Sequence, residues 1–405
     1  MNILNVYLNN RVIGTITLLS GERSFLAFDE SYLNDDHRLT LSQSFFSQQG
    51  AIIAETKIRQ TRLPPFFSNL LPEGHLRTYL AAQGGINAGR EFKLIELLGE
   101  DLPGAVSIKP LEGAGISASK KEDIQKASAD DARYRFSLAG IQLKFSALLN
   151  NRGGLTIPVS GIGGNWIVKL PAQNFISVPE NEWSMLNMAK KIGIPVPETR
   201  LIDLDDIKGL PDLGVFSGTK ALAVRRFDRG ETGKRIHIED FAQVFGVYPN
   251  DKYRKANYTN LANMVWILTG ETGLRDFIRR LTFSILIGNG DMHLKNWSLI
   301  YPDGRVPQLA PAYDFVSTIP YIPNDKLALN LSGSKDMGAI NLDHFKKLAA
   351  KAHIPEFLVL KEVKETVEQT RQHWLENYLD YPLPDDLSSR INRHLTRTHL
   401  VPKQN

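Results

Sequence analysis

The sequence predicts an α+β protein with a β-rich N-terminal part and a mainly helical C-terminal lobe. Leu4, Val6 and Leu8 alternate along the chain, which is the period of a half-buried strand. From His237 onward the apolar residues recur with a helical period, apart from a hairpin around Pro302. The chain has 405 residues, more than one hydrophobic core comfortably serves, so we expect two or three subdomains.

The composition is that of an ordinary globular protein, and it excludes several kinds of site. Apolar residues make up 42% of the chain, charged residues 23%, and the formal net charge is +4, which permits contact with nucleic acid without requiring it. Cysteine is absent, which excludes disulfides, thiolate metal sites and cysteine nucleophiles. The N-terminal residues lack the features of a signal peptide, and no apolar run approaches the length of a membrane span. We therefore expect a cytoplasmic protein without membrane contact.

Composition and periodicity divide the chain into four segments. Residues 1–111 predict a first β-rich unit. Residues 112–132 are rich in Gly, Ser and charged side chains, cannot bury enough surface to offset their ordering entropy, and predict a linker or mobile loop. Residues 133–229 predict a second strand-rich part that ends in a charged, hinge-like strand. Residues 230–405 predict the helical lobe, with helical segments at 238–245, 261–268, 277–287 and 342–378.

The stretch most typical of a functional site is the turn within residues 288–301, between a helical run and a strand-like run. It carries Asp291, His293, Lys295 and Asn296. Polar side chains on a loop between rigid elements usually face a ligand. The Asp291-x-x-x-x-Asn296 spacing matches the catalytic loop of protein kinases, where the aspartate accepts the substrate hydroxyl proton and the asparagine holds Mg²⁺.

A second acidic residue follows at the distance that this interpretation requires. After the hairpin, Asp314 in Ala312-Tyr313-Asp314-Phe315 takes the place of the metal-binding aspartate of the kinase DFG motif. An isolated D-x-x-x-x-N is common by chance, and Asp or Asn in a turn often serves only the turn. Asp314 favours the functional interpretation, because Asn296 and Asp314 together offer the oxygen ligands that Mg²⁺ prefers.

Two further segments could bind phosphate. The strand at residues 166–170 carries Lys169 among apolar neighbours, and a buried lysine needs a partner. Glu182, in the first turns of a predicted helix, is placed to pair with it. Residues 136–149 predict a strand and turn whose backbone N–H groups could cover phosphates, although neither G-x-x-x-x-G-K-[ST] nor G-x-G-x-x-G occurs there.

With these residues in place, the chain resembles the HipA family of toxin serine/threonine kinases over nearly its whole length. The N-terminal unit with residues 63–74, which we interpret as a packed corner without catalytic residues, is similar to the small β-rich domain of that family. The motifs that carry the rest of the resemblance are Ser137-Leu-Ala-Gly-Ile-Gln-Leu-Lys144, Arg226-Phe-Asp-Arg229, Glu239-Asp-Phe-Ala-Gln243, Asn289-Gly-Asp-Met-His-Leu-Lys-Asn296 and Pro311-Ala-Tyr-Asp-Phe315.

The resemblance implies a bilobal protein-kinase-like fold that uses ATP and Mg²⁺. It implies Asp291, Asn296 and Lys295 as catalytic residues, Asn296 and Asp314 as metal ligands, and Ser137 as an autophosphorylation site. The residues implied at the nucleotide site are Lys169, Ala139, Gly140, Gln142, Lys144, Phe227, Gln243 and His293. Phosphate on Ser137 would repel the ATP phosphates and make the reaction self-limiting.

The resemblance also implies partners. These are a small HipB-like helix-turn-helix antitoxin, operator DNA bound through the antitoxin complex, and a protein substrate, for which aminoacyl-tRNA synthetases are the family precedent. One position departs from the family, since Arg225 stands where an acidic residue usually precedes the Arg226-Phe-Asp-Arg motif. Backbone groups around Phe227 would then have to make the hinge contact.

Three other functions stay open. Small-molecule phosphotransferases of the aminoglycoside or choline type share the glycine before the aspartate, here Gly290, but lack the N-terminal unit and the Ser137 loop. A catalytically silent repressor module would have no chemical need for the complete set of Asp291, Asn296 and Asp314. A metal hydrolase built on Asp291 and His293 would need further ligands at suitable spacing, and the sequence offers none.

Overall fold

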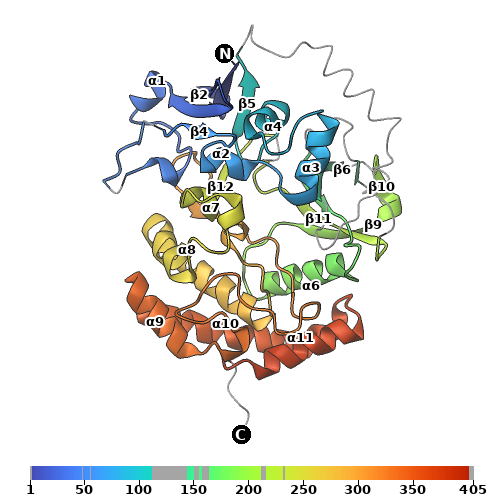
Figure 1. Ribbon diagram of the computed structural model, residues 1–405. Coiled ribbons are helices and arrows are strands. Elements are labelled where there is room, and N and C mark those ends of the chain that lie inside the picture. The colour runs from blue at the N-terminus through green and yellow to red at the C-terminus, as the bar shows by residue number, and fades with distance from the viewer. Residues whose placement is uncertain are drawn as a thin grey trace.

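The computed structural model describes most of the chain, in three β-sheets and a helical lobe (Figure 1). The described residues are 2–47, 49–54, 56–111, 144–149, 155–156, 164–210, 216–230 and 233–400. The predicted linker at 112–132 lies outside them. The N-terminal unit, blue in Figure 1, lies at one end of the molecule, and the orange and red helices lie at the other.

The N-terminal unit is an antiparallel sheet of strand order β4-β3-β2-β1-β5 with its own core. The alternation of Leu4, Val6 and Leu8 does place these side chains on one buried face of β1. The strands are β1 (Asn2–Leu8), β2 (Arg11–Leu19), β3 (Arg23–Phe28), β4 (Arg59–Gln60) and β5 (Val106–Pro110). The helices are α1 (Glu30–Leu33), η1 (Gln43–Phe45), α2 (Pro65–Leu70), α3 (Gly74–Gln83) and α4 (Glu91–Leu98).

A second sheet, of strand order β10-β7-β6-β8-β11-β9, follows and packs against α6 (Val178–Lys191). Pro179 and Glu180 stand in the first turn of α6 and Lys190 and Lys191 in its last, which suits the helix dipole. The strands are β6 (Lys144–Leu149), β7 (Leu155–Thr156), β8 (Trp166–Lys169), β9 (Thr199–Asp203), β10 (Ile207–Lys208) and β11 (Lys220–Arg225), with η2 (Leu204–Asp206) between β9 and β10.

The helical lobe holds the largest core and a third sheet, of order β12-β13-β14. Its longest helix, α8, bends at Gly270, whose φ of 64° is outside helical values. The strands are β12 (His237–Asp240), β13 (Ser298–Tyr301) and β14 (Gln308–Leu309). The helices are α7 (Phe241–Val244), η3 (Pro249–Asp251), α8 (Tyr258–Leu286), η4 (Leu294–Asn296), η5 (Met337–Ala339), α9 (Leu342–Ala352), α10 (Glu356–Asn377), η6 (Tyr378–Asp380) and α11 (Asp385–Arg397).

The structure corrects two predicted helices. The segment 238–245 begins as strand β12, because its backbone pairs with β13, and only then turns into α7 through an Asp240–Gln243 capping box. The segment 342–378 is two helices, since α9 ends at His353 with a φ of 54° and Pro355 stands before α10. Within the described part of the chain, no helix is both long and apolar enough to cross a membrane.

The predicted hinge, residues 226–229, takes part in a buried network of ion pairs. This network joins the N-terminal unit to the rest of the molecule. Arg226 binds Asp228 through two hydrogen bonds of 2.9 and 2.8 Å. Arg229 reaches Asp228 and, in the N-terminal unit, Asp101, both at 2.8 Å. The backbone N–H of Gly104 also donates to Asp228 at 2.8 Å. The segment just after β11 is therefore held by the N-terminal unit.

Candidate active site

The loop after α8 carries the predicted catalytic residues on a fixed backbone. Gly288 allows the turn, since its φ is 68° and a Cβ there would lie 2.9 Å from the side chain of Ile319. The Asn289 side chain accepts a hydrogen bond of 3.0 Å from the Asp291 N–H, and the Asn296 amide nitrogen donates to the Asp291 carbonyl at 2.8 Å. With its backbone held on both sides, Asp291 presents a half-exposed carboxylate.

Lys169 at the end of β8 contacts two carboxylates from distant parts of the chain, Glu182 on α6 and Asp314. The predicted pair of Lys169 and Glu182 therefore forms. Burial alone would lower the pKa of Lys169, but Asp314 and Glu182 raise it above its usual value, so the ammonium stays charged. Protein kinases likewise pair a strand lysine with a helix glutamate and place a metal-binding aspartate in the same site.

Asp314 stands in an uncommon backbone conformation, with a φ of 55°. Left-handed geometry at a non-glycine residue is a strain that functional sites often store. The Asn296 amide nitrogen is engaged by Asp291, so its amide oxygen is the atom that would face a cation. Amide and carboxylate oxygens such as those of Asn296 and Asp314 are the ligands that Mg²⁺ prefers. Among the described residues, no three His, Asp or Glu side chains gather as a metal site.

His293 is buried beside Asp291, with 3.9 Å between its Nε2 and the carboxylate. Burial lowers the pKa of His293 to about 4, although Asp291 acts in the opposite direction. The ring is therefore neutral at pH 7. Its Nδ1 has no hydrogen-bond partner among the described residues, so it is a polar atom left for a ligand or water.

Two other predicted nucleotide residues lie in different surroundings. The Gln243 side chain accepts from the Asp240 N–H at 2.8 Å and donates to the Phe66 carbonyl at 3.0 Å, so protein groups occupy both ends of its amide. The ring of Phe227 packs against Tyr313, with 5.8 Å between centroids. Phe227 therefore contacts the residue that precedes Asp314 in the chain, whereas Gln243 ties α7 to the N-terminal unit.

Lys295 of the predicted catalytic loop is bound by residues of the N-terminal unit. Its Nζ lies 2.6 Å from the Glu73 carboxylate and donates to the Asn69 carbonyl at 3.0 Å. Glu73 also pairs with Lys252 at 2.8 Å. Burial would raise the pKa of Glu73, but Lys295 and Lys252 lower it to about 2. The segment 63–74, interpreted from sequence as a packed corner without catalytic residues, thus reaches the catalytic loop.

Tyr253 is a second residue that sequence reasoning missed. Its hydroxyl donates to the Asp291 carboxylate at 2.6 Å, and its ring lies edge-on to His293 with 4.9 Å between centroids. Neither Glu73 nor Tyr253 belongs to a local pattern of known spacing. The only sequence signal was proximity of an acidic residue and a tyrosine to proline-marked turns, which is too common to point to a site.

Comparison with known proteins shows the family. The model of the HipA-like C-terminal domain matches residues 136–374, and the model of the HipA N-terminal domain matches residues 4–109. The putative kinase Y4dM of Sinorhizobium fredii is 48% identical over 404 residues, covering 99% of this chain and 98% of the relative. The chain belongs to the HipA family of protein kinases.

Other members extend the comparison. The serine/threonine-protein kinase toxin HipA of Shewanella oneidensis is 25% identical over 416 residues, with 94% of this chain and 92% of the relative covered. The solved complex of Shewanella oneidensis HipA with HipB and operator DNA contains a chain that aligns with a TM-score of 0.73 at 22% identity, covering 98% of this chain and 96% of that one. The bilobal kinase-like α+β fold predicted from sequence is thereby confirmed.

The position that departs from the usual HipA motif is a surface residue. The Arg225 side chain is half-exposed and lies 3.7 Å from Glu198. The Arg225 N–H donates to the Glu198 carbonyl at 2.8 Å and the Arg226 N–H to the Asn165 carbonyl at 2.7 Å. These contacts fix the backbone of the predicted hinge without using the Arg225 guanidinium.

The predicted phosphate-binding loop of this HipA-family chain lies largely outside the described residues. Ser137, Ala139, Gly140 and Gln142 are among the residues that are not described. Lys144 opens β6, where its backbone is in register with Lys169 on β8. The predicted loop therefore directly precedes β6, the strand that pairs with β8 at the position of Lys169.

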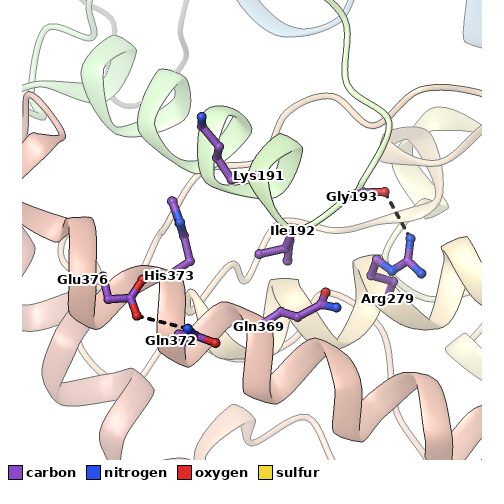
Figure 2. Close-up of a pocket in the computed structure, with 8 residues that line it drawn as sticks. All are labelled: Lys191, Ile192, Gly193, Arg279, Gln369, Gln372, His373 and Glu376. Atoms are coloured by element: carbon purple, nitrogen blue, oxygen red, sulfur yellow. Dashed lines mark hydrogen bonds between the residues drawn. The ribbon is translucent and has the colours of Figure 1, made fainter.

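A cavity of about 540 Å³ lies away from these residues, between the end of α6, α8 and α10 (Figure 2). Its lining is polar, and Arg279 at its edge donates to the Gly193 carbonyl at 3.1 Å and is also bound by Glu362. None of the predicted site residues lines it. The predicted site residues are thus separate from this cavity.

Proposed function

We propose that the protein is an ATP-dependent serine/threonine protein kinase that acts as the toxin of a toxin–antitoxin pair. The observation that carries the kinase part is the contact of Lys169 with both Glu182 and Asp314. It joins β8, α6 and the metal motif around one cation, beside a loop that presents Asp291 and Asn296. A binding-only protein has no use for this arrangement.

The residues divide the reaction among them. Lys169 binds phosphate oxygens of ATP, and Asp291 accepts a hydrogen bond from a serine or threonine hydroxyl. As the oxygen–phosphorus bond forms, the hydroxyl proton moves to Asp291, the bond from the γ-phosphorus to the bridging oxygen breaks, and ADP leaves. Since this transition state is loose, positioning and charge neutralisation supply most of the acceleration.

Asn296 and Asp314 would hold Mg²⁺, which when bound neutralises charge on the phosphates. Asp314 contacts Lys169 directly, so the metal ligand and the phosphate-binding lysine are already side by side. The neutral His293 ring, whose Nδ1 has no partner among the described residues, lies 3.9 Å from Asp291 and also feels the charge of Asp314. It can donate or accept one hydrogen bond without adding charge to the site.

The finer parts of the proposal concern targets and partners. We propose Ser137 as a self-limiting autophosphorylation site, a cellular protein such as an aminoacyl-tRNA synthetase as substrate, and a HipB-like antitoxin that brings the kinase to operator DNA. The support for the antitoxin is the fold shared with a HipA chain described in complex with HipB and operator DNA. The match of both HipA domain models supports the toxin assignment.

The test of the kinase reaction is self-labelling. The purified chain, incubated with radiolabelled ATP and Mg²⁺ and no other protein, should gain phosphate on Ser137. Asp291→Asn should reduce labelling by orders of magnitude, because it removes the group that positions the hydroxyl. Asp303→Asn is the matched control, since Asp303 caps the exposed hairpin turn at Arg305 and should label normally. Undiminished labelling of Asp291→Asn, at unchanged thermal stability, would falsify the assignment of Asp291.

A further inference from the structure

The hydroxyl of Tyr253 is hydrogen-bonded to the carboxylate of Asp291, the proposed catalytic residue. It donates to Asp291 Oδ1 at 2.6 Å. Burial raises the pKa of Tyr253 above its usual value, and the Asp291 charge raises it further, so the hydroxyl keeps its proton at neutral pH and acts only as a donor here. Hydrogen bonds to a charged acceptor are the stronger ones. In the free protein, therefore, part of the capacity of Asp291 to accept is already used.

Tyr253 is positioned from two sides. Its ring lies edge-on to His293, and the neighbouring Lys252 is tied to Glu73 of the N-terminal unit at 2.8 Å. Yet 40% of the tyrosine is exposed, and it follows η3 on a connection between α7 and α8. The side chain can therefore turn away from Asp291 without disturbing a core.

An acceptor hydroxyl must donate to the carboxylate that removes its proton. The Tyr253 hydroxyl makes this same kind of bond to this same carboxylate. On the basis of the proposed kinase function, we propose that Tyr253 marks the acceptor subsite and competes with the acceptor hydroxyl for Asp291. The acceptor is then a serine or threonine on a segment that enters across Lys252 and Tyr253 and displaces the tyrosine.

The experiment compares the full chain with Tyr253→Phe, which keeps the ring against His293 and removes only the competing hydroxyl. The readout is the initial rate of ADP release with Mg²⁺ and ATP, because ADP is released whether water or a protein hydroxyl is the acceptor. We expect the rate to rise about fivefold, which corresponds to about 1 kcal/mol for one lost competing hydrogen bond. The KM for ATP should stay within about twofold, since the Tyr253 hydroxyl binds Asp291 and not the proposed phosphate-binding residue Lys169.

Tyr248→Phe is the matched control. Its hydroxyl donates to the Leu63 carbonyl at 3.1 Å and does not contact Asp291, so its rate should equal that of the wild type. An unchanged or lower rate in Tyr253→Phe, in a protein that unfolds at the wild-type temperature, overturns the competition and leaves the kinase assignment standing. If the wild type itself releases no ADP and labels no protein, the proposed function fails and the inference with it.

Discussion

Glu73→Gln should uncouple the N-terminal unit from the catalytic loop. The substitution keeps the shape of the side chain but removes the charge that holds Lys295 at 2.6 Å and Lys252 at 2.8 Å. The pKa of Glu73 is lowered from 4.5 to about 2, a shift equivalent to about 3 kcal/mol. About a third of the side chain is exposed, and screening by water reduces the expected loss of unfolding free energy to about 1–2 kcal/mol.

The assay is urea unfolding followed by tryptophan fluorescence. All five tryptophans (Trp166, Trp183, Trp266, Trp297 and Trp374) lie after residue 111, so the signal reports the kinase part alone. A lower urea midpoint in Glu73→Gln would therefore show that a residue of the N-terminal unit stabilises the kinase lobes. The control is Glu22→Gln, because Glu22 has a side chain of nearly equal exposure and, among the described residues, forms its ion pair with Arg90 inside the N-terminal unit, at 3.6 Å.

The pH dependence gives an independent check with a fixed sign. A carboxylate whose folded pKa lies below its unfolded value contributes stability above the unfolded pKa and loses it as the pH falls. The difference between wild type and Glu73→Gln should thus be full at pH 7 and shrink below about pH 4.5, toward the folded pKa of about 2. Equal midpoints for the two proteins at pH 7, or a difference that grows on acidification, would refute the role of Glu73.

Two further predictions concern the metal and the partner. Asp314→Asn should weaken ATP binding in Mg²⁺ but alter it little in EDTA, because the change removes the charge of a proposed metal ligand next to Lys169. Titration calorimetry in both buffers measures the affinity for ATP. Equal weakening in EDTA would argue against a metal role for Asp314. Expression of the chain alone should arrest growth, and co-expression of a small neighbouring HipB-like protein should relieve the arrest; normal growth in both cases would remove the toxin assignment while leaving the kinase intact.

The sequence predicted those parts of the site that depend on order along the chain. The Lys169–Glu182 pair follows from a strand, a connection and a helix in succession, and Asp314 follows from one hairpin. The contact of Asn69 with Lys295 spans 226 residues. No local sequence pattern predicts which surface the segment 63–74 packs against. The docking of this segment depends on side-chain shape and charge across two cores, which periodicity does not encode.

The error in segment 238–245 has a related cause. Ile238, Phe241, Ala242 and Phe245 recur at helical spacing. Residues 237–240 nevertheless form a strand, because β13, at residues 298–301, offers them backbone partners. Tertiary pairing overrides a local preference when the segment is short. In contrast, the alternation in β1 and the amphipathic α6 with proline in its first turn agree with their tertiary setting, and both were predicted correctly.

The network around Asp228 limits how this kinase can open and close. Hinge closure of two lobes needs a few connecting residues that can change their backbone angles, but here Asp101 and Gly104 bind the residues that directly follow β11. The N-terminal unit is also fixed to the helical lobe through Thr40 and Gly304, and through Leu41 and His237. We therefore expect the N-terminal unit and the helical lobe to travel as one body. Nucleotide exchange would then depend on a movement of the second sheet together with α6. The part that moves would be smaller than half of the molecule.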